Sequence, residues 1–393
     1  MWEILPRRTD LRREGDPVTE FDKLTLIERD VQASTWTVEG PASALAEFTL
    51  GTGAILVRDG EPIVSGSVHT IDGGGHVDDS GRSTHTRTCA FVDDSWHLWT
   101  RLCYPDPAHV LTSTPSLFAV SHDKRTGNRE DLILAYIAAN LGPAAPQAVR
   151  RLTSLVMPTS LDRGGTTTVE ARMDVLGDLV AELAEAANLR VRIMHDESTG
   201  TPKLALTITP SLDRSADVVF GPPESVRATG ALRSWGYGIS VPKVTDAITF
   251  AGGDLEMRYA AAFGDATALA VTGHRVEQLV DAGQTEDIAV VNDAAARALQ
   301  EGAAPMSIEF KIATGGDLVP RVDFWVGDRV GVEIPDLPNV TDNRLREAMT
   351  TVTAQGEELE LVVGSGNATL TDTPEVLRAD EALKRIRNIE RGK

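Results

Sequence analysis

The chain has 393 residues, of which 41% are hydrophobic and 24% are charged, so it can bury the core of two or three domains. Its formal net charge is −20, because 58 acidic residues outnumber 38 basic ones. This balance argues against a surface that wraps nucleic acid, which needs clustered lysine and arginine. No stretch has the apolar length of a membrane span, and the N-terminal residues lack the apolar core of a signal peptide. We therefore expect a protein made in the cytoplasm, with no membrane anchor.

The segment LVRDGEPIVSG at 56–66 predicts a tight β-hairpin. An Asp-Gly pair between two apolar runs favours a type I′ turn, because both central residues of that turn need positive φ. In this register Arg58 faces Glu61 and Val57 faces Pro62. Because Pro62 cannot donate a hydrogen bond to a third strand, we expect the hairpin to include an edge of a sheet.

Strand patterns dominate the first hundred residues, with Gly-rich and Asp-rich turns between them. Such spacing is typical of a sandwich or a barrel. The last predicted strand, 95–103, would place Trp96 and Trp99 on opposite faces. Cys89 and Cys103 lie on neighbouring predicted strands, so their thiols could meet across the sheet. Two cysteines in a cytosolic product are nevertheless usually reduced.

Residues 106–213 predict a compact α/β insert. Its first helix starts after Asn128, a good N-cap, and its apolar stripe ends before a Gly-Pro pair. A second helix repeats apolar residues at helical spacing and ends near Asn188, a plausible C-cap. Two strands follow, at 189–194 and 203–209.

From about residue 214 the chain returns to β. One helix is expected at about 286–300, with Thr285 as its cap and Gly302 as its stop. The terminal stretch 369–393 predicts a helix with an apolar stripe at a/d spacing, and such a charged, exposed helix often docks on a neighbour. That stripe consists of Val376, Ala379, Leu383 and Ile386.

Motifs of known chemistry are missing from the sequence, including GxSxG, GxxxxGK[ST] and HExxH. A glycine-rich loop gathers the best set of metal ligands, although such loops are more often solvated hairpin tips: His69, His76, Asp78, Asp79 and His85. Another stretch would suit a sugar-binding platform or, more simply, a packed core: Trp96, His97 and Trp99. We assign no catalytic, cofactor-binding or metal-binding residue.

Five segments carry a family pattern in the same order along the chain. They are LVRDGEPIVSG at 56–66, EDLILAYIAANLGPAAP at 130–146 followed by Arg150-Arg151, HRVEQLVDAGQTED at 274–287, FWVGDRVGV at 324–332 and ELELVVGSG at 358–366. The ordered set resembles the minor tail protein family of actinobacterial siphophages, which is related in fold to the baseplate hub proteins of contractile phages.

The resemblance implies a mainly β fold with two tube-type β-barrel domains. Residues 1–105 and a return segment at 214–240 would form the first barrel, and 106–213 the α/β insert. The second barrel, with one helix, would occupy 241–368, and a C-terminal helix would occupy 369–393.

The resemblance also implies a non-enzymatic function. Three copies would form a hub of pseudo-sixfold symmetry at the distal end of the virion tail tube, and would close or gate that end until DNA ejection. Expected partners are the distal tail protein ring, the tape measure protein and tail-tip or receptor-binding proteins. DNA would pass through the lumen without specific binding, because an acidic wall repels phosphate. We expect the free hairpin edge and the terminal helix to form interfaces, through Asp59, Gly60, Pro62, Val376, Leu383 and Ile386.

Two other classes remain open from the sequence. A carbohydrate-binding or receptor-binding tail-tip module would use the stretch from Trp96 to Trp99 and the glycine-rich loop. A hydrolase of the cell envelope would need a pair of acidic groups whose separation cannot be read from the sequence.

Overall fold

The structure is a computed structural model that describes residues 1–77, 83–113, 117–239, 241–252, 259–283, 288–303, 306–312, 318–335, 337 and 344–364. Several sequence predictions lie outside these residues. They are the two acidic candidates of the glycine-rich loop, the Thr285 cap and the C-terminal helix with its interface residues: Asp78, Asp79, Val376, Leu383 and Ile386.

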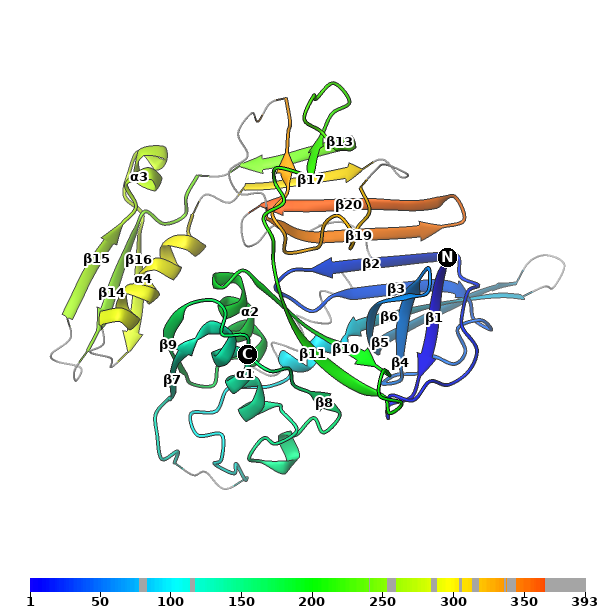
Figure 1. Cartoon of the computed structure of the whole chain (residues 1–393), viewed down its shortest axis with the longest axis horizontal. Coiled ribbons are helices and arrows are strands. Elements are labelled where there is room, and N and C mark those ends of the chain that lie inside the picture. Colours follow the sequence, from blue (N-terminus) through cyan, green and yellow to red (C-terminus); the bar gives the residue numbers. More distant parts are fainter. Residues whose placement is uncertain are drawn as a thin grey trace.

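Two β regions at opposite ends of the chain share one hydrogen-bonded sheet of twelve strands, in the order β1-β4-β5-β6-β3-β2-β19-β20-β17-β13-β12-β18. Its two halves meet where β2 pairs antiparallel with β19, in the middle of the long sheet (Figure 1). The strands are β1 Trp2–Arg7, β2 Lys23–Arg29, β3 Thr35–Pro41, β4 Gly53–Arg58, β5 Glu61–Val77, β6 Ser83–Asp93, β12 Val219–Gly221, β13 Gly230–Ile239, β17 Met306–Ile312, β18 Gly331–Val332, β19 Leu345–Thr353 and β20 Gly356–Gly364.

Each half of the sheet has its own apolar core. In the first half, Trp36 and Phe91 face each other across β3 and β6, and their rings stack 4.8 Å apart. In the second half, Phe220 packs against Phe310 and Phe324. Burial of these large side chains is the main favourable contribution to folding of both halves.

The segment 214–240, which we expected to complete the first β part, pairs with strands of the second part. Strand β13 is antiparallel to β17, and β12 is parallel to β13 and β18. Local periodicity identifies a strand but not its partner, because the partner is chosen by long-range packing. Among the described residues no pairing joins the end strands β1 and β18, so the two closed barrels are not confirmed.

The Asp-Gly hairpin is confirmed. Asp59 and Gly60 have φ of 53° and 86°, and Arg58 faces Glu61 while Val57 faces Pro62. Pairing of β5 with β6 begins only at Gly66, so the exposed Pro62 has a strand on one side only. The sheet therefore has a local edge at this proline, as the sequence predicts.

The two helices and two strands predicted within residues 106–213 are present, together with three strands, β7, β8 and β9, that we did not predict. Asn128 caps the first helix by accepting a hydrogen bond of 2.8 Å from the backbone N–H of Asp131, and Asn188 takes a positive φ of 51° after the second helix. The helices and β10 enclose a third apolar core. The elements are β7 Asp123–Asn128, α1 Arg129–Asn140, β8 Leu155–Val156, β9 Thr166–Ala171, α2 Leu176–Ala186, β10 Leu189–Asp196 and β11 Lys203–Pro210.

The predicted strand at 95–103 is wrong. The chain forms the 3-10 helix η1, Asp94–Leu98, and its rotation brings Trp96 and Trp99 to the same side. Their rings stack 6.5 Å apart, and both side chains are buried. Helix α2 packs against the face of Trp99 at Gly177, where a Cβ atom would lie 2.4 Å from the ring.

Residues 246–301 contain a separate three-stranded sheet in the order β15-β14-β16, which we did not expect from the sequence. Helix α4 covers one face of it through Ala295 and Ala298, and a further helix, α3, begins after the Asp265 cap. The elements are β14 Asp246–Ala251, β15 Tyr259–Gly264, α3 Ala266–Thr272, β16 Glu277–Gly283 and α4 Ile288–Glu301.

Candidate functional site

The predicted interface residues of the hairpin lie at the surface. Asp59 bonds to the N-terminal amino group, which together with Arg58 holds the pKa of this carboxyl below its usual value. Arg58 also pairs with Glu357 at 3.2 Å, which ties the hairpin to the turn between β19 and β20. A contact of Asp59, Gly60 and Pro62 with another chain stays a prediction.

The structure does not bring the histidine candidates together as metal ligands. His69 packs edge-on against Trp96 at 6.4 Å, whereas His76 and His85 lie farther along the exposed part of the β5–β6 ribbon. Within the described residues no group of three or more His, Cys, Asp or Glu side chains could hold a metal ion.

The tryptophan stretch is core rather than an exposed platform. Trp96 and Trp99 are 7% and 5% exposed, and the Trp99 indole N–H donates to Asp178 at 2.9 Å. This burial removes the support for a sugar-binding site on these rings. Cys89 and Cys103 are both free and buried, and they belong to different apolar cores.

The most elaborate polar arrangement lies where β2, β19 and the insert meet (Figure 1). It is a set of buried ion pairs, which we call the charged junction and which consists of Glu28, Asp30, Arg192, Arg321, Arg344 and Arg346. Arg344 directly precedes β19 and Arg346 lies on it, and both reach the same acidic partner, Asp30.

Asp30 is the centre of one half of the junction. Arg344 grips both of its carboxylate oxygens, at 2.6 and 3.1 Å, and Arg346 adds a contact of 3.2 Å. The Asp30 side chain is 1% exposed, and those of Arg344 and Arg346 are 5% and 8% exposed. Arg346 also pairs with Glu185 of α2 at 2.8 Å, so the same cluster holds the insert.

Glu28 is the centre of the other half. Burial alone would raise the pKa of this carboxyl, but the charges of Arg321 and Arg192 outweigh burial and the pKa is lowered. Arg321 belongs to the second β region and Arg192 to β10 of the insert. Glu28 therefore connects all three parts of the molecule as an ionised group.

A second polar cluster joins the insert to the first β region. We call it the His195 cluster, and it consists of Arg7, Ser65, Asp94, His195 and Glu197. Because the Arg7 guanidinium can only donate, His195 Nδ1 accepts from it at 3.2 Å and Nε2–H donates to Glu197 at 2.9 Å. Burial lowers the pKa of His195, while Glu197 opposes that shift. The His195 imidazole is therefore neutral in the folded protein.

The contact between the insert and the first β region also contains one group whose burial is energetically unfavourable. Asp93 is 4% exposed, and one of its carboxylate oxygens has no hydrogen-bond partner among the described residues. Burial raises the pKa of Asp93 to about 6, although Arg192 opposes the shift. The carboxylate is therefore destabilised at neutral pH.

Sequence reasoning missed both clusters, because their members lie up to 316 residues apart. A signal was present in the pairs Arg190-x-Arg192 and Arg344-x-Arg346, which place two arginines at alternate positions among largely apolar neighbours. Alternate arginines on a buried strand indicate a buried acidic partner, but they do not identify it.

Taken together, the fold and its two buried clusters define a β scaffold that carries an α/β insert. The chain belongs to the Siphovirus ReqiPepy6 Gp37-like protein family, whose model matches residues 2–365. The expected relationship to a siphophage family is thereby confirmed. No curated protein matches the chain.

Three solved structures with a similar fold are described as tail proteins. A tail protein from Neisseria meningitidis MC58 is 12% identical, with a TM-score of 0.55, and the alignment covers 93% of this chain and 96% of that one. The 43 kDa tail protein of prophage MuSo2 from Shewanella oneidensis is 14% identical, with a TM-score of 0.54 and coverage of 92% and 98%. Prophage tail protein gp18 from Listeria monocytogenes EGD-e is 9% identical, with a TM-score of 0.51 and coverage of 98% and 99%.

Helices in the described part of the chain are all too short or too polar to cross a membrane.

Proposed function

We propose that this protein is a structural, non-enzymatic component of a siphophage tail, and that three copies form the hub ring at the distal end of the tail tube. The family and the fold of the three tail proteins support the tail assignment. The limits 1–105, 106–213, 241–368 and 369–393 and the closure of the two β regions into tube walls are part of this proposal, with the segment 214–240 now assigned to the second region.

The observation that carries the proposal is the continuous sheet joined at β2 and β19. Two β regions held edge to edge by a buried ion-pair network form a stiff wall segment. A wall that transmits force between a tube and its tip needs such stiffness, because flexible joints would absorb the movement.

The β5–β6 ribbon supports assembly with further copies. Beyond the pairing of β6 with β3, residues 75–77 pair with 83–85, and these residues are exposed. Among the described residues no third strand pairs with this part of the ribbon. Figure 1 shows this ribbon extending past the body of the molecule. A two-stranded ribbon is only marginally stable in water, so we expect a neighbouring chain to cover it.

In the proposed ring the acidic chain would line the lumen and would not bind the DNA that passes through it. The net charge of −20 disfavours binding of phosphate and suits a lumen through which DNA slides. The distal tail ring, the tape measure protein and receptor-binding parts would be the neighbours of the ring, and its location would be the virion tail tip. A reconstruction of the ring with a basic lumen would contradict this part of the proposal.

The mass of the purified protein in solution tests the ring. We expect a species of three times the 42.1 kDa chain mass by light scattering, and a ring by electron microscopy. Val77 on the ribbon is 64% exposed, and Val77→Asp should shift the protein toward monomer without unfolding the chain. Leu161→Asp makes the same change at an exposed position of the insert and should leave the mass unchanged. A chain that stays monomeric at high concentration and does not bind purified tail tubes would overturn the proposal.

A further inference from the structure

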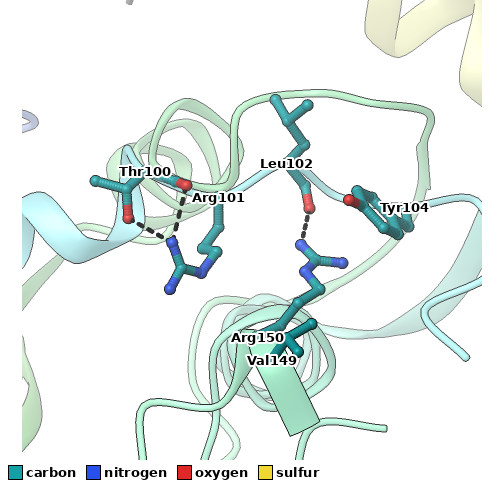
Figure 2. Close-up of a pocket in the computed structure, with 6 residues that line it drawn as sticks. All are labelled: Thr100, Arg101, Leu102, Tyr104, Val149 and Arg150. Atoms are coloured by element: carbon teal, nitrogen blue, oxygen red, sulfur yellow. Dashed lines mark hydrogen bonds between the residues drawn. The ribbon is translucent and has the colours of Figure 1, made fainter. Parts of the chain in front are cut away.

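A pocket of about 330 Å³ opens between residues 100–104 and residues 149–150 of the insert, and its lining residues belong to neither the charged junction nor the His195 cluster. Figure 2 shows the guanidinium groups of Arg101 and Arg150 on opposite sides of it. The lining residues are Thr100, Arg101, Leu102, Tyr104, Val149 and Arg150.

Arg150 is held in place by neutral partners. Its guanidinium donates to the carbonyl oxygen of Leu102 and to the side-chain oxygen of Asn140, and it lies 3.8 Å above the ring of Tyr104. The residue is 7% exposed, and burial lowers the pKa of its guanidinium. Within the described part of the chain no carboxylate forms an ion pair with Arg150.

Arg101 is the less satisfied of the two. One of its terminal nitrogens donates to the carbonyl and hydroxyl oxygens of Thr100, both at 3.1 Å. Its Nε–H is buried and has no hydrogen-bond partner among the described residues. A buried donor without a partner costs free energy, and Arg101, like Arg150, forms no ion pair in the described part of the chain. The pocket thus concentrates two unbalanced positive charges in a protein with a net charge of −20.

We propose that this pocket binds a single carboxylate of a partner polypeptide, held between the guanidinium groups of Arg101 and Arg150. The planar guanidinium presents paired N–H donors that match the two oxygens of a carboxylate. Val149 at the rim is 89% exposed, so an apolar surface for the rest of the partner adjoins the charged site. A polyanion such as DNA is disfavoured because the acidic chain repels its many charges. This inference does not depend on the hub assignment, since a chain of any oligomeric state would have the pocket.

Small probes can identify the ligand class with the full-length protein. We would titrate N-acetyl-glutamic acid α-amide, which carries a side-chain carboxylate, and N-acetyl-leucine, which carries a chain-end carboxylate. Their neutral counterparts are N-acetyl-glutamine amide and N-acetyl-leucine amide, and inorganic phosphate is the competing anion. We expect one of the carboxylates to shift the Arg101 Nε–H resonance in arginine side-chain NMR spectra, with an affinity that falls as salt is raised. The acid that binds more tightly shows whether the partner contributes a side-chain carboxylate or a chain-end carboxylate.

Substitutions then assign the effect to the pocket. Binding by the Arg101 variants is read from the Arg150 Nε–H resonance, which they keep. Arg101→Gln should weaken carboxylate binding by at least about tenfold, which corresponds to about 1.4 kcal/mol. Arg101→Lys should restore part of the binding, because lysine returns the positive charge but not the paired N–H donors. Arg172→Gln, at an exposed arginine of the same insert, should change nothing. Equal binding of acids and their amides, binding of phosphate but not of carboxylates, or full binding by Arg101→Gln would each overturn the proposal. Because Arg101→Lys keeps the cation, its binding remains informative if Arg101→Gln does not fold.

Discussion

The carboxylate of Asp30, on the turn after β2, lies between Arg344 and Arg346, which follow it by 314 and 316 residues in the chain. The contact fastens the two halves of the long sheet at the seam where β2 pairs with β19. Glu185 of the insert binds the same Arg346, so one buried cluster fixes three parts of the molecule.

Asp30→Ala tests the contribution of this cluster to stability. Removing one partner of a buried pair leaves uncompensated charge, and we expect a loss of about 3–5 kcal/mol in the free energy of unfolding. Glu182→Ala is the matched control, because Glu182 pairs with Arg297 at 2.8 Å with both side chains nearly half exposed. It should cost less than about 1 kcal/mol. Urea unfolding measures both, and equal losses would show that the junction does not hold the sheet.

Asp93→Asn tests the buried carboxyl beside the His195 cluster. The pKa of Asp93 is raised to about 6 in the folded protein, so the folded state takes up a proton before the unfolded state does as the pH falls. The group therefore stabilises the fold at low pH, and this stability is lost as the pH rises through about 6. Wild type should gain stability relative to Asp93→Asn when the pH is lowered from about 7 to 4. Parallel pH profiles would contradict the assignment.

His195→Gln tests the opposite dependence of stability on pH, in the contact between the insert and the first β region. Burial lowers the pKa of His195, so the unfolded state binds the proton first as the pH falls below the usual histidine value of about 6.5. The contribution of neutral His195 to the free energy of unfolding is fully present above a pH of about 6.5 and is lost at lower pH. The groups that face the ring are Arg7, Asp94 and Glu197. Unfolding measured between pH 7 and 5 should be less acid-sensitive in His195→Gln, whereas the exposed His274→Gln should keep the wild-type profile.

Gly177→Ala tests the packing of α2 on Trp99. Helix propensity alone predicts a gain in stability, since alanine favours a helix over glycine by about 1 kcal/mol. A Cβ atom at this position would nevertheless lie 2.4 Å from the indole ring, so we expect a net loss of about 1–3 kcal/mol. Gly236→Ala is the control, because a Cβ atom there meets nothing within 4 Å. A stabilised Gly177→Ala would show that the Trp99 face is loosely packed.

The cap of α1 at Asn128 and the turn at Asp59-Gly60 were both predicted from the sequence. In each case the conformation depends on a few neighbouring residues, so the local sequence is sufficient to predict it. The strand predicted at 95–103 was wrong for a related reason. Trp96 and Trp99 are three residues apart, which would put them on opposite faces of a strand but puts them on the same side of a 3-10 helix, where both rings are buried.

By itself the sequence determined the helices of the insert and the hairpin turn, because each depends on neighbours in the chain. It also determined the acidic charge and the family pattern, which are read directly from the residues. Tertiary structure alone decided that β13 joins the second β region, that β2 pairs with β19, and that Asp30 binds Arg344 and Arg346. The partners in those contacts are chosen by packing and by the requirement that a buried charge be compensated. Neither long-range packing nor the pairing of buried charges produces a sequence pattern with a fixed spacing.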